Sequence, residues 1–478
     1  MAIPMDSEPP LVVDLDGTLI RSDMLLESML AAVCRAPATA LWMPFWLLRG
    51  RAVLKRELAA RAQVGVEALP YRPEVLALVR DAGREGRRVV LATAADATLA
   101  RDVAAHLGGF SEILASDGAM NLKGAAKSQA LVDRFGERGF DYVGDSAADT
   151  AVWKRARRAL VVGGPGLLAL ARAASPGASA VEGTPAGGSR WLRALRLHQW
   201  PKNLLVAVPL LTAHRWTDVQ ALTTSLTACF AFCLVASAIY VANDLMDLAS
   251  DRLHDVKRGR PFASGEIGIA AGLAAIPLLL VAGWTLAVAA SAAFAWALAA
   301  YAVIALAYSL RLKQLAVVDV MVIGGLYTLR LVGGALAIGV VMSQWLLAFS
   351  LFVFLSLALV KRHGELAKHI GRDTTLSLLP GRGYRPGDAP LVAQLGTASG
   401  YLSVLVLALY LNSDTVATLY TRPLWLWALP VLLLYWITRV WLLAWRGTLA
   451  EDPLSFALRD GASYLVVALM VLCVLVAT

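Results

Sequence analysis

The sequence predicts two parts: an α/β domain built on a parallel sheet, followed by an all-α membrane bundle of about nine helices. Up to about residue 190 charged and apolar residues are mixed, whereas long apolar stretches follow Asn203. Hydrophobic residues make up 58% of the 478 residues, charged residues make up 17%, and the mean hydropathy is +0.62. This composition is too apolar for an ordinary soluble protein. We therefore expect one soluble domain and one membrane domain.

Three apolar runs predict strands of the soluble domain, at 11–15, 89–93 and 142–145. Each run ends in polar residues, and the first ends in a turn at Gly17. Helical stretches lie between the runs, as in a parallel sheet that binds ligands at the carboxyl ends of its strands. We place this domain at 1–172, and a linker rich in Gly, Ser, Pro and Ala at 173–190.

The remainder, 191–478, contains about nine apolar spans of membrane length. They lie at roughly 203–216, 221–242, 267–287, 290–308, 315–339, 342–360, 391–411, 423–445 and 461–477. Acidic Asp6 and Glu8 stand where a signal peptide needs basic residues, so we expect a cytoplasmic N-terminus at the inner (plasma) membrane. The loops after the even-numbered spans then face the cytoplasm and carry basic residues, as the positive-inside rule requires. These residues are Arg252, Lys257, Arg258 and Arg260; Arg311 and Lys313; Lys361, Arg362, Lys368 and Arg372; and Arg446.

The cysteines and the net charge suggest no further kind of site. Cys34, Cys229, Cys233 and Cys473 include no CxxC pair, and three of them lie in apolar runs. We expect them to pack as small apolar residues, without disulfides or zinc. The net charge of +9 arises from many basic residues beside the apolar spans, so we expect no nucleic-acid partner.

Acidic and phosphate-binding residue types follow the predicted strands of the soluble domain. They are Asp14-Leu15-Asp16-Gly17-Thr18, Thr93, Lys127 in a Gly-x-x-Lys context, and Gly144-Asp145-Ser146-x-x-Asp149. Two carboxylates two residues apart in a loop can converge on one cation or phosphoryl group. The four pieces in this order resemble the haloacid dehalogenase superfamily, which implies a Rossmann-like α/β fold with a helical cap.

The resemblance implies a magnesium-dependent phosphatase with Asp14 as the nucleophile and Asp16 as the general acid/base. Thr93 and Lys127 would bind the phosphoryl oxygens, with Lys123 a less favoured substitute for Lys127. The main chain of Asp16 would hold the metal together with the carboxylates of Asp14 and Asp145, supported by that of Asp149. A purely structural, degenerate domain is the alternative.

The cap is expected at about 21–72, where a helical insertion separates the first motif from the rest. It contains the apolar run 40–48, followed by Arg49, Arg51, Lys55 and Arg56. The run is too short to cross a bilayer but suits an interfacial segment. The sequence leaves two interpretations open: a cap that touches the membrane to receive a lipid-linked phosphate, or a cap core.

An acidic cluster ends the second span, with Asn243, Asp244, Asp247 and Asp251. In a helix, Asn243, Asp247 and Asp251 fall at i, i+4 and i+8, with Asp244 beside Asp247. Carboxylates at the end of an apolar helix are costly unless they bind a cation, so we expect all four residues at a magnesium–diphosphate site. A solvated helix end is the alternative.

The NDxxDxxxD pattern resembles the first aspartate motif of the UbiA superfamily of intramembrane prenyltransferases. Members hold a prenyl diphosphate between this motif and a second acidic motif after the sixth span, where this sequence reads Lys361-Arg362-His363-Gly364-Glu365-Leu366. A narrower resemblance, over 191–478, is to the decaprenyl-phosphate phosphoribosyltransferase branch. It rests on 199–203, 252–261 with Gly265, 308–313 with Asp319, and Lys361, Arg362 and Glu365.

That resemblance implies transfer of phosphoribosyl from phosphoribosyl pyrophosphate to a polyprenyl phosphate such as decaprenyl phosphate. Asp244, Asp247 and Asp251 would bind magnesium, with Asn243 orienting them. The phosphate-binding residues would be Lys202, Asn203, Lys257, Arg258, Lys313, Lys361 and Arg362, although positive-inside topology alone also explains single basic residues. The fused phosphatase would remove the 5′-phosphate of the product. The alternatives are a prenyltransferase acting on an aromatic or lipid acceptor, and a transporter with a regulatory domain.

Overall fold

The computed structural model describes residues 8–116, 122–183, 188–369, 378–379, 381–449 and 452–478. The chain divides into two compact units. The first unit consists of the residues up to Leu195 together with Tyr240–Ile276, and the second of Arg196–Ile239 together with Pro277–Thr478. Residues 184–187 of the predicted linker and Arg372 lie outside the described residues.

The first unit contains a six-stranded sheet in the order β3-β2-β1-β4-β5-β6, with every described pair of strands parallel. The strands are β1 Leu11–Val13, β2 Val89–Asp96, β3 Glu112–Ser116, β4 Asp141–Gly144, β5 Arg158–Val161 and β6 Ser179–Ala180. All three strands predicted from the apolar runs are present. This order places a topological switch point between β1 and β4, where Val13 pairs with Val143.

Apolar side chains cover both faces of the sheet, because successive residues of a strand point to opposite faces. Leu11 and Val13 join one core with helices α4 and α5, while Val12 joins a second core with α6, α7 and α8. The helices are α4 Pro73–Arg84, α5 Ala97–Leu107, α6 Ala125–Phe135, α7 Thr150–Trp153 and α8 Pro165–Ala174, and a short 3₁₀ turn, η2, covers Ala147–Asp149. Two-sided covering makes this an α/β domain, as the sequence predicts.

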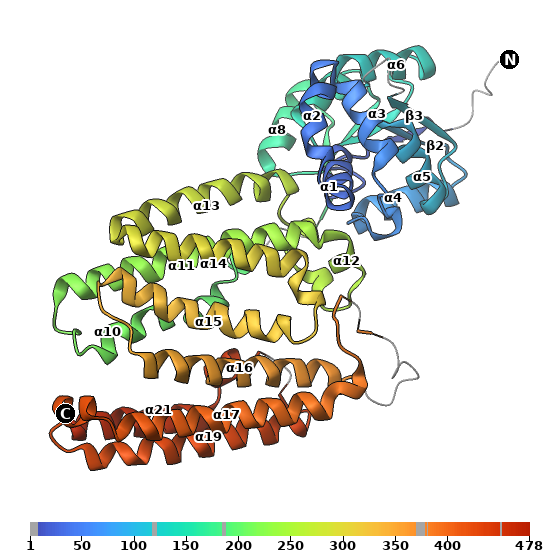
Figure 1. Ribbon diagram of the computed structural model, residues 1–478. Helices are drawn as coiled ribbons and strands as arrows, with labels where there is room; N and C mark the ends of the chain where they lie inside the picture. The colour runs from blue at the N-terminus through green and yellow to red at the C-terminus, as the bar shows by residue number, and fades with distance from the viewer. Residues whose placement is uncertain (1–7, 117–121, 184–187, 370–377, 380, 450–451) are drawn as a thin grey trace. The chain divides into compact units, whose positions relative to one another are not determined.

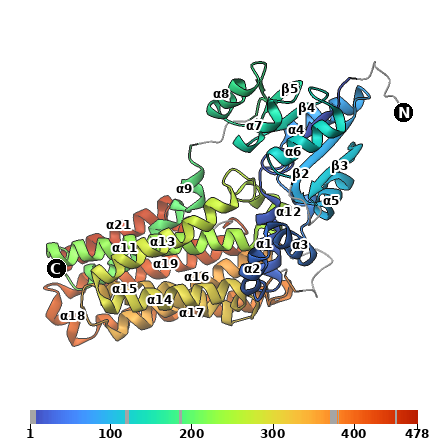
Figure 2. The ribbon, with the colours of Figure 1, turned by 90° about the horizontal axis from the view of Figure 1, so that it is seen from above.

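The cap is helical, as expected, and lies between β1 and α4 in the chain. It consists of α1 Met24–Arg35, α2 Thr39–Leu48, α3 Arg51–Arg61 and η1 Val66–Ala68. Helices α1, α2 and α3 lie side by side in Figures 1 and 2 and enclose a small core that includes Trp46 and Leu58.

Residues Tyr240–Ile276 complete the first unit although they are distant in sequence. They include α12 Leu248–Leu253 and η4 Lys257–Gly259. Leu245, Leu248 and Phe262 form an apolar cluster with Leu26 and Leu30 of the cap helix α1. Arg252 also forms a bidentate ion pair with Glu27, in which both side chains are 6% exposed.

Long apolar helices dominate the rest of the chain, and seven helices in its described part are long and apolar enough to cross a membrane. They are α11 Val219–Met246, α13 Ile269–Ala290, α14 Ala292–Leu310, α15 Val318–Ala337, α16 Gln344–Ala367, α17 Ala389–Leu411 and α19 Ala428–Trp445, the last two extended by η6 Pro386–Asp388 and η7 Pro423–Trp427. In the second unit, α14 to α17 pack successively against one another, and Figure 1 shows them aligned as a bundle. The predicted last span is α21 Gly461–Ala477, one residue short of the 18-residue length that defines a candidate span.

The predicted first span, 203–216, is not one long α-helix. Its residues belong to a 3₁₀ segment, η3 Leu197–Ala207, and to the short helix α10 Val208–Thr212. Pro201 and Pro209 explain the interruption, because proline lacks the amide hydrogen that an α-helix needs. The predicted first span is therefore a 3₁₀ segment followed by a short α-helix.

Candidate functional site

Two acidic loops meet at the switch point of the sheet. Asp14 directly follows β1, and its amide nitrogen donates to the Val143 carbonyl 3.1 Å away. Asp145 directly follows β4, the neighbouring strand. Because parallel strands present their carboxyl ends at the same edge, residues 131 positions apart in sequence reach one site.

A chain of polar contacts connects Asp14 to Asp149. Lys127 Nζ lies 2.8 Å from Asp14 Oδ1 and 3.1 Å from the Tyr142 hydroxyl. That hydroxyl donates to Asp149 Oδ1 over 2.8 Å, and Ser146 donates to Asp149 Oδ2 from both its amide and its hydroxyl. The lysine predicted from the Gly-x-x-Lys context is therefore the cation that contacts the predicted nucleophile.

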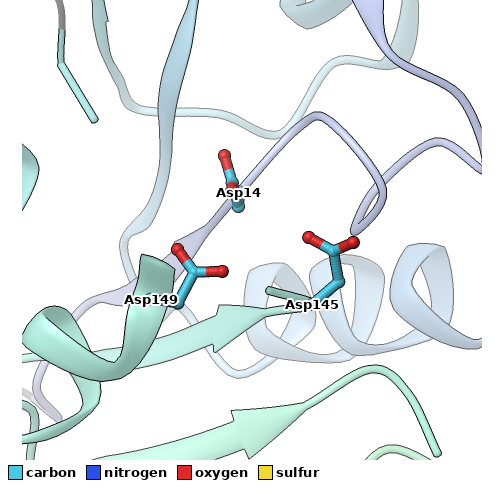
Figure 3. A group of neighbouring side chains, drawn as sticks. All are labelled: Asp14, Asp145 and Asp149. Atoms are coloured by element: carbon cyan, nitrogen blue, oxygen red, sulfur yellow. The ribbon is translucent and has the colours of Figure 1, made fainter. Parts of the chain in front are cut away.

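Asp14, Asp145 and Asp149 are neighbours (Figure 3), and ligand oxygens of all three lie within 4.8 Å of one another. Thr18 donates to Asp145 Oδ1 over 3.2 Å. Gly17 permits this approach, because it adopts φ +71° and a Cβ there would lie 1.9 Å from Asp145 Oδ2. The glycine of the motif is thus required by both backbone conformation and space.

The crowded carboxylates fit a divalent cation. Burial, together with the neighbouring Asp14 and Asp149, raises the pKa of Asp145 to about 7. Burial also raises the pKa of Asp14, although Lys127 acts in the opposite direction. Negative charge at this point is costly without a cation, and three carboxylate oxygens are the ligands that Mg²⁺ prefers.

Asp16 lies in the same cavity but has different partners. Its Oδ1 accepts from the amide of Met24 over 2.8 Å, and burial together with Asp23 and Asp14 raises its pKa to about 7. The cavity has a volume of about 730 Å³ and is lined by residues of the strand ends and of the cap. Lys55 of cap helix α3 also lines it and donates to the Ala94 carbonyl over 2.6 Å.

Thr93 remains a prediction as a phosphate-binding residue. Its side chain is fully buried in β2, and its hydroxyl accepts from the amide of Ala95 over 2.9 Å. The following residues, Ala94 to Asp96, line the cavity. Lys123 also lines the cavity, but Lys127 is the lysine paired with Asp14.

The second acidic motif lies at the junction of α11 and α12 in the first unit. The helix breaks at Asp247, which caps α12 with φ −90° and ψ 8°. Asp244 and Asp251 are 3% and 1% exposed, and both contact Arg260 Nη1, at 3.1 and 2.6 Å. The helical spacing predicted for Asn243, Asp247 and Asp251 is present in the backbone, because the Asp247 amide donates to the Asn243 carbonyl over 2.9 Å and the Asp251 amide donates to the Asp247 carbonyl over 2.8 Å. Magnesium binding by these residues stays a prediction.

Arg260, which sequence reasoning did not assign to this site, is the shared partner of the two carboxylates. Lys257 Nζ lies 3.8 Å from Asp251 Oδ1, while Arg258 is exposed. Asn243 Oδ1 is buried and accepts no hydrogen bond from the described residues. In that part of the chain Asp244, Asp247 and Asp251 do not form a second tight acidic triad. An unsatisfied acceptor beside two converging carboxylates nevertheless fits a cation ligand set.

A cluster of cations lies inside the second unit. Lys202 Nζ is 2.8 Å from Asp452 Oδ2, and the charges of Lys361 and Arg330 also act on Lys202. Lys202 and Lys361 were predicted from sequence, whereas Arg330 and Asp452 were not. The charges of Lys202 and Lys361 act on Asp452, and that of Arg330 acts on Lys202, so the cluster is a place where phosphate groups are favoured.

Arg330 is 5% exposed and is held in place by Asn203. Its Nε donates to Asn203 Oδ1 over 3.0 Å, and Nη2 donates to the Tyr301 hydroxyl over 3.0 Å. Asn203 Nδ2 also lies 3.2 Å from Cys233 Sγ. In this arrangement the amide of Asn203 positions Arg330, and direct phosphate contact by Asn203 stays a prediction.

Arg362 is also committed to protein partners. It is 1% exposed and forms ion pairs with Asp319 and Glu365. The Tyr384 hydroxyl donates to Asp319 Oδ1 over 2.8 Å and accepts from the amide of Val317, whose φ of +66° is unusual for a β-branched residue. Lys313, in η5 Leu312–Gln314, is partly exposed.

Comparison with known proteins identifies the family of the larger part of the chain. A model of the UbiA prenyltransferase family matches residues 204–462. The chain belongs to the UbiA family. A model of haloacid dehalogenase-like hydrolases matches residues 11–154, which include the Asp14 site. With its seven long apolar helices, this UbiA-family chain is an integral membrane protein and an enzyme of the transferase class.

Three relatives illustrate the range of similarity. The uncharacterized protein y4nM of Sinorhizobium fredii is 41% identical over 472 residues, covering 97% of this chain and 90% of the relative. Nodulation protein NoeC of Azorhizobium caulinodans is 36% identical over 57% of this chain and 88% of its own length. Decaprenyl-phosphate phosphoribosyltransferase of Mycolicibacterium smegmatis is 36% identical over 186 residues, 37% of this chain and 56% of that protein.

Proposed function

We propose that the chain transfers phosphoribosyl from phosphoribosyl pyrophosphate to a polyprenyl phosphate such as decaprenyl phosphate. The observation that carries the proposal is a cationic cluster, in which the charges of Lys361 and Arg330 act on Lys202. Donor and acceptor together carry several phosphate groups, and a cationic site matches their charge. Similarity to decaprenyl-phosphate phosphoribosyltransferases supports the same donor and acceptor.

The reaction requires charge stabilisation more than acid–base catalysis. An oxygen of the lipid phosphate attacks the anomeric carbon of ribose, and the bond from that carbon to pyrophosphate breaks. Because the attacking phosphate is already anionic, no strong base is needed. Asp244, Asp251 and Asn243, with Asp247 nearby in sequence, would hold magnesium, which supplies positive charge to the leaving pyrophosphate. Lys202, Lys361, Lys313, Lys257 and Arg258 would bind phosphates, with Asn203 and Arg362 as positioning residues.

The Asp14 site would then hydrolyse the 5′-phosphate of the lipid-linked product. Asp14 attacks phosphorus and forms an aspartyl phosphate, while Lys127 offsets the accumulating negative charge. Asp16, with a pKa of about 7, can give a proton to the departing alkoxide and then take one from water. Asp14, Asp145 and Asp149 would hold magnesium, which offsets the negative charge of the phosphoryl group.

We also propose the orientation of the chain. The first unit and the basic loops that follow α11, α14, α16 and α19 would face the cytoplasm, with the helices in the inner membrane. The proposed domains are 1–172 for the phosphatase, with a cap at about 21–72, and 191–478 for the transferase.

A single incubation tests both activities. Purified full-length protein is given radiolabelled phosphoribosyl pyrophosphate and polyprenyl phosphate, and the extracted lipid is analysed by mass spectrometry. Wild type should give lipid-linked ribose without a 5′-phosphate, whereas Asp14→Asn should accumulate the form heavier by one phosphate. Asp244→Ala should reduce transfer at least 100-fold, while Asp255→Ala, which changes an exposed acid just after α12, should not.

Different products would contradict specific parts of the proposal. A prenylated aromatic or lipid product would show that the donor is an isoprenyl diphosphate and not phosphoribosyl pyrophosphate. If wild type and Asp14→Asn give the same phosphorylated lipid, the Asp14 site does not act on the product of the transferase. The transferase assignment would be unaffected.

A further inference from the structure

The cap helix α2 has two apolar faces, and only one of them packs against other residues that the structure describes. Met43 and Trp46 on the inner face contact the cap core, and Arg61 lies over the Trp46 ring at 4.7 Å. The outer face is exposed over its whole length: Leu41 by 73%, Trp42 by 58%, Phe45 by 60% and Leu48 by 86%. Four large apolar side chains on one exposed helix face are unusual for a surface bathed only in water.

The surroundings of this face indicate its partner. Arg49, Arg51 and Arg56 follow α2 and are exposed. Tryptophan and phenylalanine beside a basic border are typical of helices that lie in the head-group layer of an anionic bilayer. The same chain contains seven helices of membrane length, so a bilayer is always near this domain.

The exposed face leads into the catalytic cavity. Leu47 of α2 and Arg51 and Leu54 of α3 line the cavity of about 730 Å³ that also contains Asp14 and Asp16. The helix that carries the exposed face therefore also contributes Leu47 to the lining of the cavity that contains the predicted nucleophile.

We propose that α2 inserts its outer face into the head-group layer of an anionic bilayer and delivers lipid-borne phosphomonoesters to the Asp14 cavity. The substrate class is a phosphate ester attached to a membrane-embedded chain, recognised while the chain stays in the bilayer. The sequence leaves two interpretations of this segment open, membrane contact and cap core. Membrane contact applies to the outer face of α2, and cap core applies to its inner face. The proposal about the substrate rests on the phosphatase activity proposed above, whereas the membrane contact does not.

Contact with lipid is measured first, because it needs no catalysis. Full-length protein with Cys34→Ser and Phe45→Cys is labelled with a fluorophore and placed in vesicles of phosphatidylglycerol and brominated phosphatidylcholine. We expect quenching by the brominated chains several-fold stronger than for a label at Asp81→Cys, on α4, where the Asp81 side chain is 60% exposed. Equal quenching at both positions would overturn the proposal. A label shielded from water but not quenched would also overturn it, and would indicate a protein partner.

Activity then separates delivery from chemistry. The double variant Trp42→Gln, Phe45→Gln should hydrolyse a long-chain alkyl phosphate in vesicles at least 10-fold more slowly, and soluble p-nitrophenyl phosphate at the wild-type rate. The control Leu170→Gln, an exposed leucine of α8, should change neither rate. Equal loss on both substrates would indicate damage to the cap and overturn the delivery step. If wild type and Asp14→Asn are equally inactive on both substrates, the phosphatase proposal fails, while quenching still decides the membrane contact.

Discussion

At the scale of single residues, Gly17 has the strictest requirement in the Asp14 site. A Cβ at this position would lie 1.9 Å from Asp145 Oδ2, and the residue has φ +71°. We expect Gly17→Ala to displace the Asp145 carboxylate and to lower the rate of phosphate-ester hydrolysis at least 30-fold. The backbone strain should also cost about 1 kcal/mol of folding free energy.

Gly86 provides the matched control. It has the same φ of +71°, but a Cβ there would have nothing within 4 Å. Gly86→Ala should therefore show similar strain and keep the wild-type hydrolysis rate with p-nitrophenyl phosphate. If both variants lose activity equally, backbone strain and not the contact with Asp145 explains the effect.

The residues of the Asp14 site could be predicted because each of them follows a strand or starts a helix at the same sheet edge. Arg330 and Asp452 could not be predicted in this way. Arg330 meets Asn203 across 127 positions of sequence, and Lys202 meets Asp452 between segments that share no periodic pattern. Such contacts depend on how apolar helices pack, which a local motif does not specify.

At the scale of elements, Asp141 ties the start of β4 to its neighbours. It is 1% exposed and accepts hydrogen bonds from Arg157 Nε and Nη2 at 2.8 and 2.7 Å, and it also pairs with Arg87, which precedes β2. Burial alone would raise the pKa of Asp141, but the hydrogen bonds from Arg157 and Arg87 outweigh it and hold the pKa below its ordinary value.

A depressed pKa in the folded state stabilises the fold above the ordinary pKa of aspartate, and this stability is lost as pH falls through the folded-state pKa. We therefore expect Asp141→Asn to lower the free energy of opening of the sheet by about 2 kcal/mol at pH 7. The difference from wild type should shrink as pH falls below about 4. Hydrogen exchange of the β4 amides measures this difference in opening free energy, and Asp133→Asn, which changes an exposed aspartate, is the control. A difference that does not depend on pH would contradict the assigned role.

The helices also show that a sequence pattern can predict a helix without predicting its type or where it breaks. Apolar composition correctly predicted α11 and α13 to α17. It could not distinguish the 3₁₀ segment η3 from an α-helix, because the deciding features are two single prolines, Pro201 and Pro209, to which average composition is insensitive. At the end of α11, apolar composition also did not show that the helix breaks at Asp247.

At the scale of the molecule, the first unit is held together by a pair that joins distant parts of the sequence. Glu27 of α1 and Arg252 are both 6% exposed, and Arg252 Nε also donates to the Ala263 carbonyl over 3.2 Å. Arg252→Gln would leave the buried Glu27 without its cationic partner, although Ser22 still donates to it, and this costs about 3 kcal/mol. Amides of α1 should exchange roughly 100-fold faster. The exposed Arg258→Gln should have little effect on α1, and an unchanged rate in Arg252→Gln would show that the pair contributes nothing.

The discontinuity of the first unit also sets an order of events during synthesis on the ribosome. The sheet and cap are complete by Leu195, yet Leu26, Leu30 and Trp191 acquire apolar partners such as Leu245, Phe262 and Ile269 only later. Most of α11 is translated between these segments. The nascent domain must therefore emerge with an apolar surface still uncovered. That surface can be covered only after α11, the first long apolar helix, has been synthesised. Delayed membrane insertion would extend the exposure of that surface and make the unfinished domain a target for chaperones and proteases.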